Sequence, residues 1–205
     1  MLSDELLNDL KNLKPFYKSK ILCNIFSWKE LENLLNFRPA ITNSNFKPIK
    51  LIKEYKWEKA GWLTNNGCPA DVINKIIQKH VCYIQDCSRI NEKINNISKQ
   101  LENTLNLPTD AHIYFSLKEK ETDLTGFGKH KDTQHSIIVC VEGEFNIQIF
   151  ENDIVTINKD MQFGDIVFIP AGFYHQVTPK TKRLSISFAM SPLLDFFQTR
   201  EWVKI

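Results

Sequence analysis

The stretch GDIVFIPAGFYH, residues 164–175, is an apolar run that ends in a tight turn and a histidine. Five residues separate Gly164 from Pro170, and two residues separate Gly172 from His175. Glycine adopts backbone conformations that other residues avoid, and proline fixes its own φ angle. The spacing therefore predicts a strand and a turn that point His175 back into the interior of a β-structure.

A second polar cluster lies upstream, in FGKHKDTQHSIIVCVEGE at 127–144. His130 and Asp132 are two positions apart, so in an extended segment their side chains lie on one face. Together with His175 they supply two imidazoles and one carboxylate, the ligand set of non-haem Fe(II) sites with open coordination positions. These three residues are the predicted metal ligands and catalytic centre. We expect His135 to support them rather than bind the metal.

The spacing of the two stretches resembles the two motifs of the cupins. The second motif is matched up to its histidine, and Pro179 stands where the family has an asparagine. The first motif matches at His130 and Gly143, whereas Asp132 replaces its second histidine and Ser136 its glutamate. The resemblance implies a metal site inside a barrel. The alternative is a cupin barrel that has lost its metal and uses these residues as ordinary polar contacts.

The chain changes character near residue 110, where helical periodicity gives way to short apolar segments. Helical patterns occur at Leu6, Leu7, Leu10 and Leu13, in 27–36, in 69–80 and in 88–106, and 81–86 could be a strand. Strands are expected near 111–118, 136–142, 145–150, 153–157, 165–169, 174–178 and 183–189. Such closely spaced strands indicate a sandwich or a barrel.

Together with the cupin resemblance, this pattern predicts an α+β fold, a double-stranded β-helix (cupin or jelly-roll barrel) with a helical N-terminal half. We expect a single domain over 1–205. It would comprise a mainly helical region (1–110), a barrel core (111–190) and a short C-terminal helix (191–205).

Residues 79–148 contain VCYIQD, a helical stripe, HIYFS, GFGKHKD and VCVEGE, in this order. This order resembles the JmjC-type oxygenases, in particular their ribosomal-oxygenase or cupin-like branch, and the resemblance extends over about residues 25–190. It implies an enzyme that uses Fe(II), O2 and 2-oxoglutarate. Hydroxylation of a protein or peptide side chain is the usual reaction in that branch.

The resembling family binds the far carboxylate of 2-oxoglutarate with a Lys or Arg two residues after the EG glycine. That position is Phe145 here, and no lysine or arginine occurs from 132 to 158. A buried dianion without a cation is unfavourable, so a substitute is needed or the cosubstrate differs. Arg183 and Ser185 resemble the R-x-S element of other 2-oxoglutarate oxygenases. Further candidates for the cosubstrate site share one face of an expected strand: Tyr114, Ser116 and, less favoured, Lys118.

The composition indicates where the protein is located and in which state its cysteines are. The chain has no apolar run near eighteen residues and no signal-peptide pattern, so we expect a cytoplasmic protein without a membrane span. Its five irregularly spaced cysteines are expected to be reduced thiols.

Residues 11–59 hold ten lysines and Arg38 against four glutamates. Such an excess is usually a solvated face, and otherwise it marks an acidic partner. The same chemistry on tRNA or another nucleic acid therefore stays open. Two further alternatives also stay open. One is a metal-binding cupin that acts as a sensor without 2-oxoglutarate turnover, and the other is a cupin oxygenase that uses no cosubstrate. The oligomeric state is left open, a homodimer included.

Overall fold

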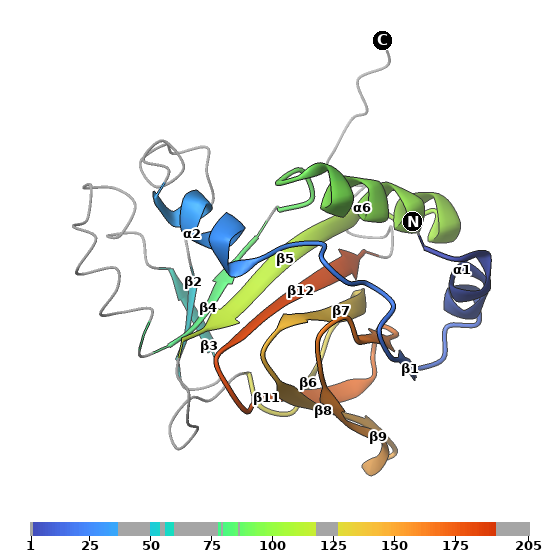
Figure 1. Ribbon diagram of the computed structural model, residues 1–205. Coiled ribbons are helices and arrows are strands. Elements are labelled where there is room, and N and C mark those ends of the chain that lie inside the picture. The colour runs from blue at the N-terminus through green and yellow to red at the C-terminus, as the bar shows by residue number, and fades with distance from the viewer. Residues whose placement is uncertain are drawn as a thin grey trace.

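The computed structural model describes residues 2–36, 50–53, 56–59, 78, 80–85, 87–117 and 127–191 (Figure 1). The helices among them are α1 (Asp4–Lys11), α2 (Trp28–Asn36) and α6 (Glu92–Leu105). The first strands are β1 (Phe16–Lys18), β2 (Lys50–Lys53), β3 (Lys56–Lys59), β4 (Val81–Ile84), β5 (Thr109–Ser116) and β6 (His130–Lys131). The remaining strands are β7 (His135–Glu142), β8 (Phe145–Glu151), β9 (Ile154–Met161), β10 (Ile166–Ile169), β11 (Tyr174–Pro179) and β12 (Arg183–Met190).

The strands form two antiparallel sheets. The larger has the order β1-β10-β7-β12-β5-β4-β2-β3, and the smaller has the order β6-β11-β8-β9. Consecutive strands β7 and β8, β9 and β10, and β10 and β11 lie in different sheets, so the chain crosses between the sheets as it winds. This winding is the double-stranded β-helix that the sequence predicted (Figure 1).

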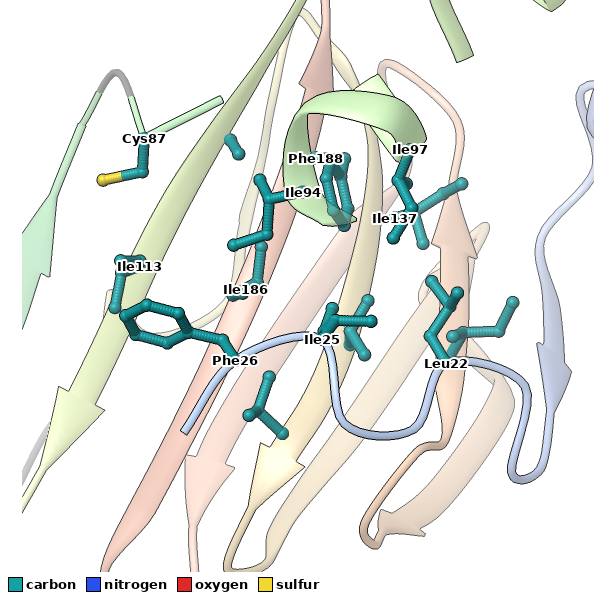
Figure 2. Packing of buried hydrophobic residues seen from close by; sticks show 14 of the residues in the cluster. Leu22, Ile25, Phe26, Cys87, Ile94, Ile97, Ile113, Ile137, Ile186 and Phe188 are labelled. Carbon is teal, nitrogen blue, oxygen red and sulfur yellow. The ribbon is translucent and has the colours of Figure 1, made fainter. Parts of the chain in front are cut away.

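Helix α6 covers the outer face of β5 and β12 (Figure 1). Asn91 begins it, because its side-chain oxygen accepts from the backbone N–H of Ile94 at 2.8 Å. Asn106 ends it in the left-handed conformation at φ 54°. Ile94 and Ile97 lie on the predicted apolar stripe of this helix and are buried against the sheet (Figure 2).

Alternation along the strands of the larger sheet separates two apolar cores. Outward-facing side chains such as Ile113, Ile186 and Phe188 pack under α6 and the segment 22–26, as Figure 2 shows. The opposite side chains of β7 and β10 meet those of β8, including the fully buried Phe145, inside the barrel. The inner faces of β5 and β12 carry polar side chains instead, and these form part of the site described below.

All seven strands expected after residue 110 are present, with bounds that differ by a few residues. The helix predicted in 27–36 begins with a capping box, in which Glu30 N–H donates to Ser27 Oγ at 3.2 Å. Leu13 lies outside α1, with φ 49° and 45% exposure, because the helix ends at Lys11.

Strands β1, β2, β3 and β6 were not predicted, because runs of two to four residues are too short to show a period. The helix expected over 69–80 and the C-terminal helix expected over 191–205 lie almost wholly outside the described residues, and the domain boundaries stay predictions. No helix in the described part of the chain is long and apolar enough to cross a membrane.

Candidate metal centre

Two histidines from neighbouring strands face each other at one end of the smaller sheet. His130 on β6 is the direct register partner of His175 on β11, and their ring centroids are 4.3 Å apart. The turn before β11 depends on Gly172, which has φ 85° and donates its N–H to the backbone oxygen of Asp132 at 2.8 Å. The turn that the sequence predicted before His175 is therefore also hydrogen-bonded to the backbone of Asp132.

Asp132 completes a cluster of three metal-binding groups. Its carboxylate oxygens lie 3.9 Å from Nε2 of His130 and 3.7 Å from Nε2 of His175. One ligand atom from each residue can be chosen so that all three lie within 4.8 Å of one another. Two imidazoles and one carboxylate at this spacing suit a divalent transition metal with open coordination positions.

Backbone carbonyls fix the orientation of both rings. Nδ1 of His130 lies 2.9 Å from the carbonyl oxygen of Gly128, and Nδ1 of His175 lies 3.3 Å from that of Phe173. A carbonyl only accepts, so in its neutral form each ring carries its proton on Nδ1 and turns the lone pair of Nε2 toward the cluster. This second contact is typical of metal-binding histidines, and it prepares the two rings for a metal.

The electrostatic surroundings favour the neutral form of His175. Only 4% of the residue is exposed, and burial lowers the pKa of its imidazole. The neighbouring His130 lowers that pKa further, whereas the Asp132 carboxylate and a hydrogen bond to the Phe173 carbonyl raise it. A neutral imidazole is the form that binds a metal.

A cavity of about 60 Å³ opens beside the cluster. A single water needs only about 10–15 Å³ on the same measure, so the cavity has room for a small ligand. It is lined by Tyr114, Phe127, His130, Asp132, Ser136, Ile138, His175, Val177, Arg183, Ser185 and Ser187. Hydroxyls and one guanidinium are gathered in the same space as the metal-binding groups.

Arg183 is the cation of this cavity. It is 4% exposed, and its guanidinium carbon lies 5.2 Å from the ring centre of Phe145. Arg183 and Phe145 come together because the turn between β7 and β8 packs closely against the start of β12. Gly143 in this turn has φ 77°, and a Cβ at its position would collide with the Lys182 carbonyl oxygen. Arg183 faces Ser116 in register, and Ser116 Oγ is a buried hydroxyl with no hydrogen-bond partner among the described residues.

The structure brings most of the predicted site residues together. His130, Asp132 and His175 form the cluster, and Tyr114, Arg183 and Ser185 line the same cavity. Ser116 is buried next to Arg183 but is not part of the cavity wall, and Lys118 lies outside the described residues.

His135 is not part of the cluster. Its Nδ1 accepts the N–H of Ala171 at 3.0 Å, so it supports the turn before His175, as expected. The cavity also has lining residues that were not predicted as part of the site, namely Phe127, Ile138, Val177 and Ser187. Ser187 could have been found, because it shares a strand face with Arg183 and Ser185. Phe127 adjoins the HKD cluster, but the sequence gives no signal for the direction of its ring.

Comparison with known proteins agrees with this architecture. No protein-family model and no curated protein sequence matches the chain. Among solved structures, YcfD, a ribosomal oxygenase from Escherichia coli in complex with cobalt and succinic acid, superposes with a TM-score of 0.67 at 16% identity. A second YcfD structure gives a TM-score of 0.66 at 15% identity. The fold is that of the ribosomal oxygenases.

The superposition with the cobalt and succinic acid complex covers 95% of this chain and 53% of YcfD. The chain therefore spans about half the length of the ribosomal oxygenase that it resembles. A further YcfD structure, in complex with cobalt and 2-oxoglutarate, has a TM-score of 0.60 at 16% identity. The predicted resemblance to the ribosomal-oxygenase branch is confirmed at the level of the fold.

Proposed function

We propose that the protein is an Fe(II)- and 2-oxoglutarate-dependent oxygenase that hydroxylates a side chain of a protein or peptide. One observation carries the proposal: a cluster of two imidazoles and one carboxylate opens onto the same cavity as a buried arginine. A metal site alone would suit many cupins. A metal site that shares its cavity with a carboxylate-binding group suits a cosubstrate that binds both.

His130, Asp132 and His175 would hold the metal through Nε2, a carboxylate oxygen and Nε2. When bound, Fe(II) would supply the oxygen chemistry of hydroxylation, with O2 as the oxidant. The three protein ligands leave coordination positions open for small ligands. The Gly128 and Phe173 carbonyls keep the two imidazoles oriented.

Arg183 and Ser185 would bind the far carboxylate of 2-oxoglutarate. A guanidinium offers two parallel N–H donors to a carboxylate, and Ser185 faces the cavity from the same strand. Tyr114 and Ser116 would flank this end of the site. The YcfD complex with cobalt and 2-oxoglutarate supports the proposal, because a metal and 2-oxoglutarate are bound together there on the same fold.

A protein or peptide substrate is proposed because the neighbour on this fold is named a ribosomal oxygenase. Phe145 favours a second candidate, a metal-binding module that does not turn over 2-oxoglutarate. The resembling family has its cation at that position, and a phenylalanine cannot replace it in binding a carboxylate.

The test is succinate formation. The purified protein is supplied with Fe(II), O2 and 2-oxoglutarate, and succinate is measured with and without candidate ribosomal peptides. We expect succinate from the wild type and none from His175→Ala, while Tyr174→Phe, which changes an exposed neighbour, retains it. Bound metal without succinate under any condition would favour the metal-binding module.

A further inference from the structure

Arg183 is a buried charge whose surroundings decide whether it can serve a ligand. It is the first residue of β12, the strand from which Ser185 and Ser187 also line the metal cavity. Burying a charged group costs free energy unless the protein replaces the interactions that the group had with water. The groups that surround the guanidinium therefore have to stabilise it and still leave it accessible to the cavity.

The acid on the neighbouring strand is turned away from the inside of the barrel. The pairing of β12 with β7 is irregular between Leu184 and Ser185, which face Glu142 and Cys140. A bulge of this kind changes the face on which the side chains beyond it lie. Cys140 belongs to the core inside the barrel, whereas Glu142 is paired with Leu184 of the outer core. The Glu142 carboxylate accepts the N–H of Trp28 at 3.1 Å and does not occupy the space beside the guanidinium.

Phe145 offers the guanidinium a different kind of partner. The guanidinium carbon lies over the ring, 5.2 Å from its centre. The face of an aromatic ring carries partial negative charge, and it attracts a cation within about 6 Å most strongly where water is excluded. Phe145 and Arg183 are both buried, so this condition is met. The ring thus compensates part of the cost of burying the charge without placing a carboxylate in the cavity.

The position of the ring is fixed by the strands around it. Phe145 begins β8 and is paired with Met161 on one side and with Pro179 on the other. The turn before it packs so tightly that Gly143 has no room for a Cβ beside the Lys182 carbonyl oxygen. An arginine side chain has many rotamers, and a rigid surface against its guanidinium restricts them. The start of β8 therefore determines where the cation of β12 lies.

We propose that Phe145 is a positioning residue whose ring holds the Arg183 guanidinium at the cavity wall, where it can pair with an anionic group of a ligand. Phe145 acts through Arg183, since it is not itself among the residues that line the cavity. Its effect on the placement of Arg183 is independent of the proposed oxygenase function, and only the effect on 2-oxoglutarate-like ligands rests on that function.

The first test needs neither metal nor ligand. Nitrogen-15 labelling of arginine gives one Nε–H signal for each of the four arginines, Arg38, Arg89, Arg183 and Arg200. Arg183→Lys identifies the signal of interest. A proton over the face of an aromatic ring is shielded, so the Arg183 signal should move downfield in Phe145→Met, which replaces the ring by an unbranched apolar chain. An Arg183 signal that stays in place in this variant would overturn the proposal.

Phe188→Met is the matched control. Phe188 is also fully buried and lies on β12, but it packs on the outer face of the strand. The Arg183 signal should not move in this variant. If Phe145→Met does not fold, 3,4,5-trifluorophenylalanine at position 145 keeps the shape of the ring and removes the negative charge from its face. The guanidinium should then leave the ring, and an unmoved Arg183 signal would be equally decisive against the proposal.

The second test uses N-oxalylglycine as the probe in Mn(II)-loaded protein. Phe145→Met should raise its dissociation constant about fivefold to thirtyfold, the effect of a cation–π contact shielded from water, and should change nothing in an Arg183→Met background. Trifluorophenylalanine at position 145 should also raise the constant, because it weakens the contact at almost unchanged shape. Equal changes in both backgrounds, or no change in either, would overturn the positioning role. If the wild type binds no N-oxalylglycine, the proposed cosubstrate falls, and the nitrogen-15 signals still decide whether Phe145 positions Arg183.

Discussion

The guanidinium of Arg183 lies 5.2 Å from the ring centre of Phe145, on the inner side of the barrel. In the family that the chain resembles, the position of Phe145 holds the cation for the cosubstrate. Here the positive charge comes from the first residue of β12 instead, and its guanidinium occupies the space above the aromatic ring. The relationship explains how a strand pair without a base can still face a cavity that contains a positive charge.

Replacing Arg183 by methionine should weaken 2-oxoglutarate binding and leave metal binding intact. A charge-assisted hydrogen bond is worth about 1.5–3 kcal/mol, so KM for 2-oxoglutarate should rise roughly 10- to 150-fold. Succinate formation over a range of 2-oxoglutarate concentrations measures the change. The double variant Arg183→Met with Phe145→Lys returns the cation to the family position and should recover part of the affinity. An unchanged KM in Arg183→Met would contradict the assigned role.

Replacing His175 by alanine should abolish stoichiometric metal binding, because the remaining two ligands no longer enclose the ion. The matched control is His135→Gln, since His135 contacts the Ala171 N–H and lies outside the cluster. Metal content measured on the purified proteins should be near one per chain in the control and near zero in His175→Ala. Equal content in both would show that the metal binds elsewhere.

The metal-free protein should lose stability as the pH falls below neutrality. Burial lowers the pKa of His135, whose Nδ1 must stay unprotonated to accept the Ala171 N–H. In the unfolded chain an imidazole titrates near its ordinary value of about 6.5, so the unfolded state takes up the proton first. The free energy of unfolding is therefore highest above that pH and falls as the pH drops toward the lower pKa of the folded state.

Urea unfolding of the metal-free protein at pH 7.5 and at pH 5.5 measures this loss. His135→Gln keeps an acceptor for the Ala171 N–H but does not titrate, so its loss should be smaller. His175 has a lowered pKa for the same main reason, and its contribution remains in the variant. An identical loss in wild type and His135→Gln would show that His135 does not contribute.

Much of the fold and of the metal cluster could be predicted from the sequence, for physical reasons. Strand positions after residue 110 follow from alternation and from glycine turns, and the cluster follows from HKD and the turn before His175. The partners of Arg183 could not be predicted, because its contact with Phe145 depends on how β8 and β12 approach across the barrel. The contact between His112 on β5 and Tyr83 on β4 could not be predicted for the same reason, because the two residues come from different strands.

The basic segment 11–59 supplies a further prediction about the substrate. Lys50, Lys53 and Lys56 belong to β2 and β3, the two strands at one end of the larger sheet. If this region receives an acidic peptide or nucleic acid, changing all three to glutamate should raise substrate KM at low salt, and high salt should reduce the difference. A steep salt dependence of RNA binding would favour the nucleic-acid alternative. An unchanged KM at low salt would rule out this role of the segment.

The most direct test of the central claim is a crystal structure with Mn(II) in place of Fe(II) and N-oxalylglycine in place of 2-oxoglutarate. We predict one metal bound by His130, Asp132 and His175. We further predict that N-oxalylglycine chelates this metal and that its far carboxylate is paired with Arg183 and Ser185. A metal at the cluster without any chelating ligand, or a far carboxylate held by other residues, would contradict the claim.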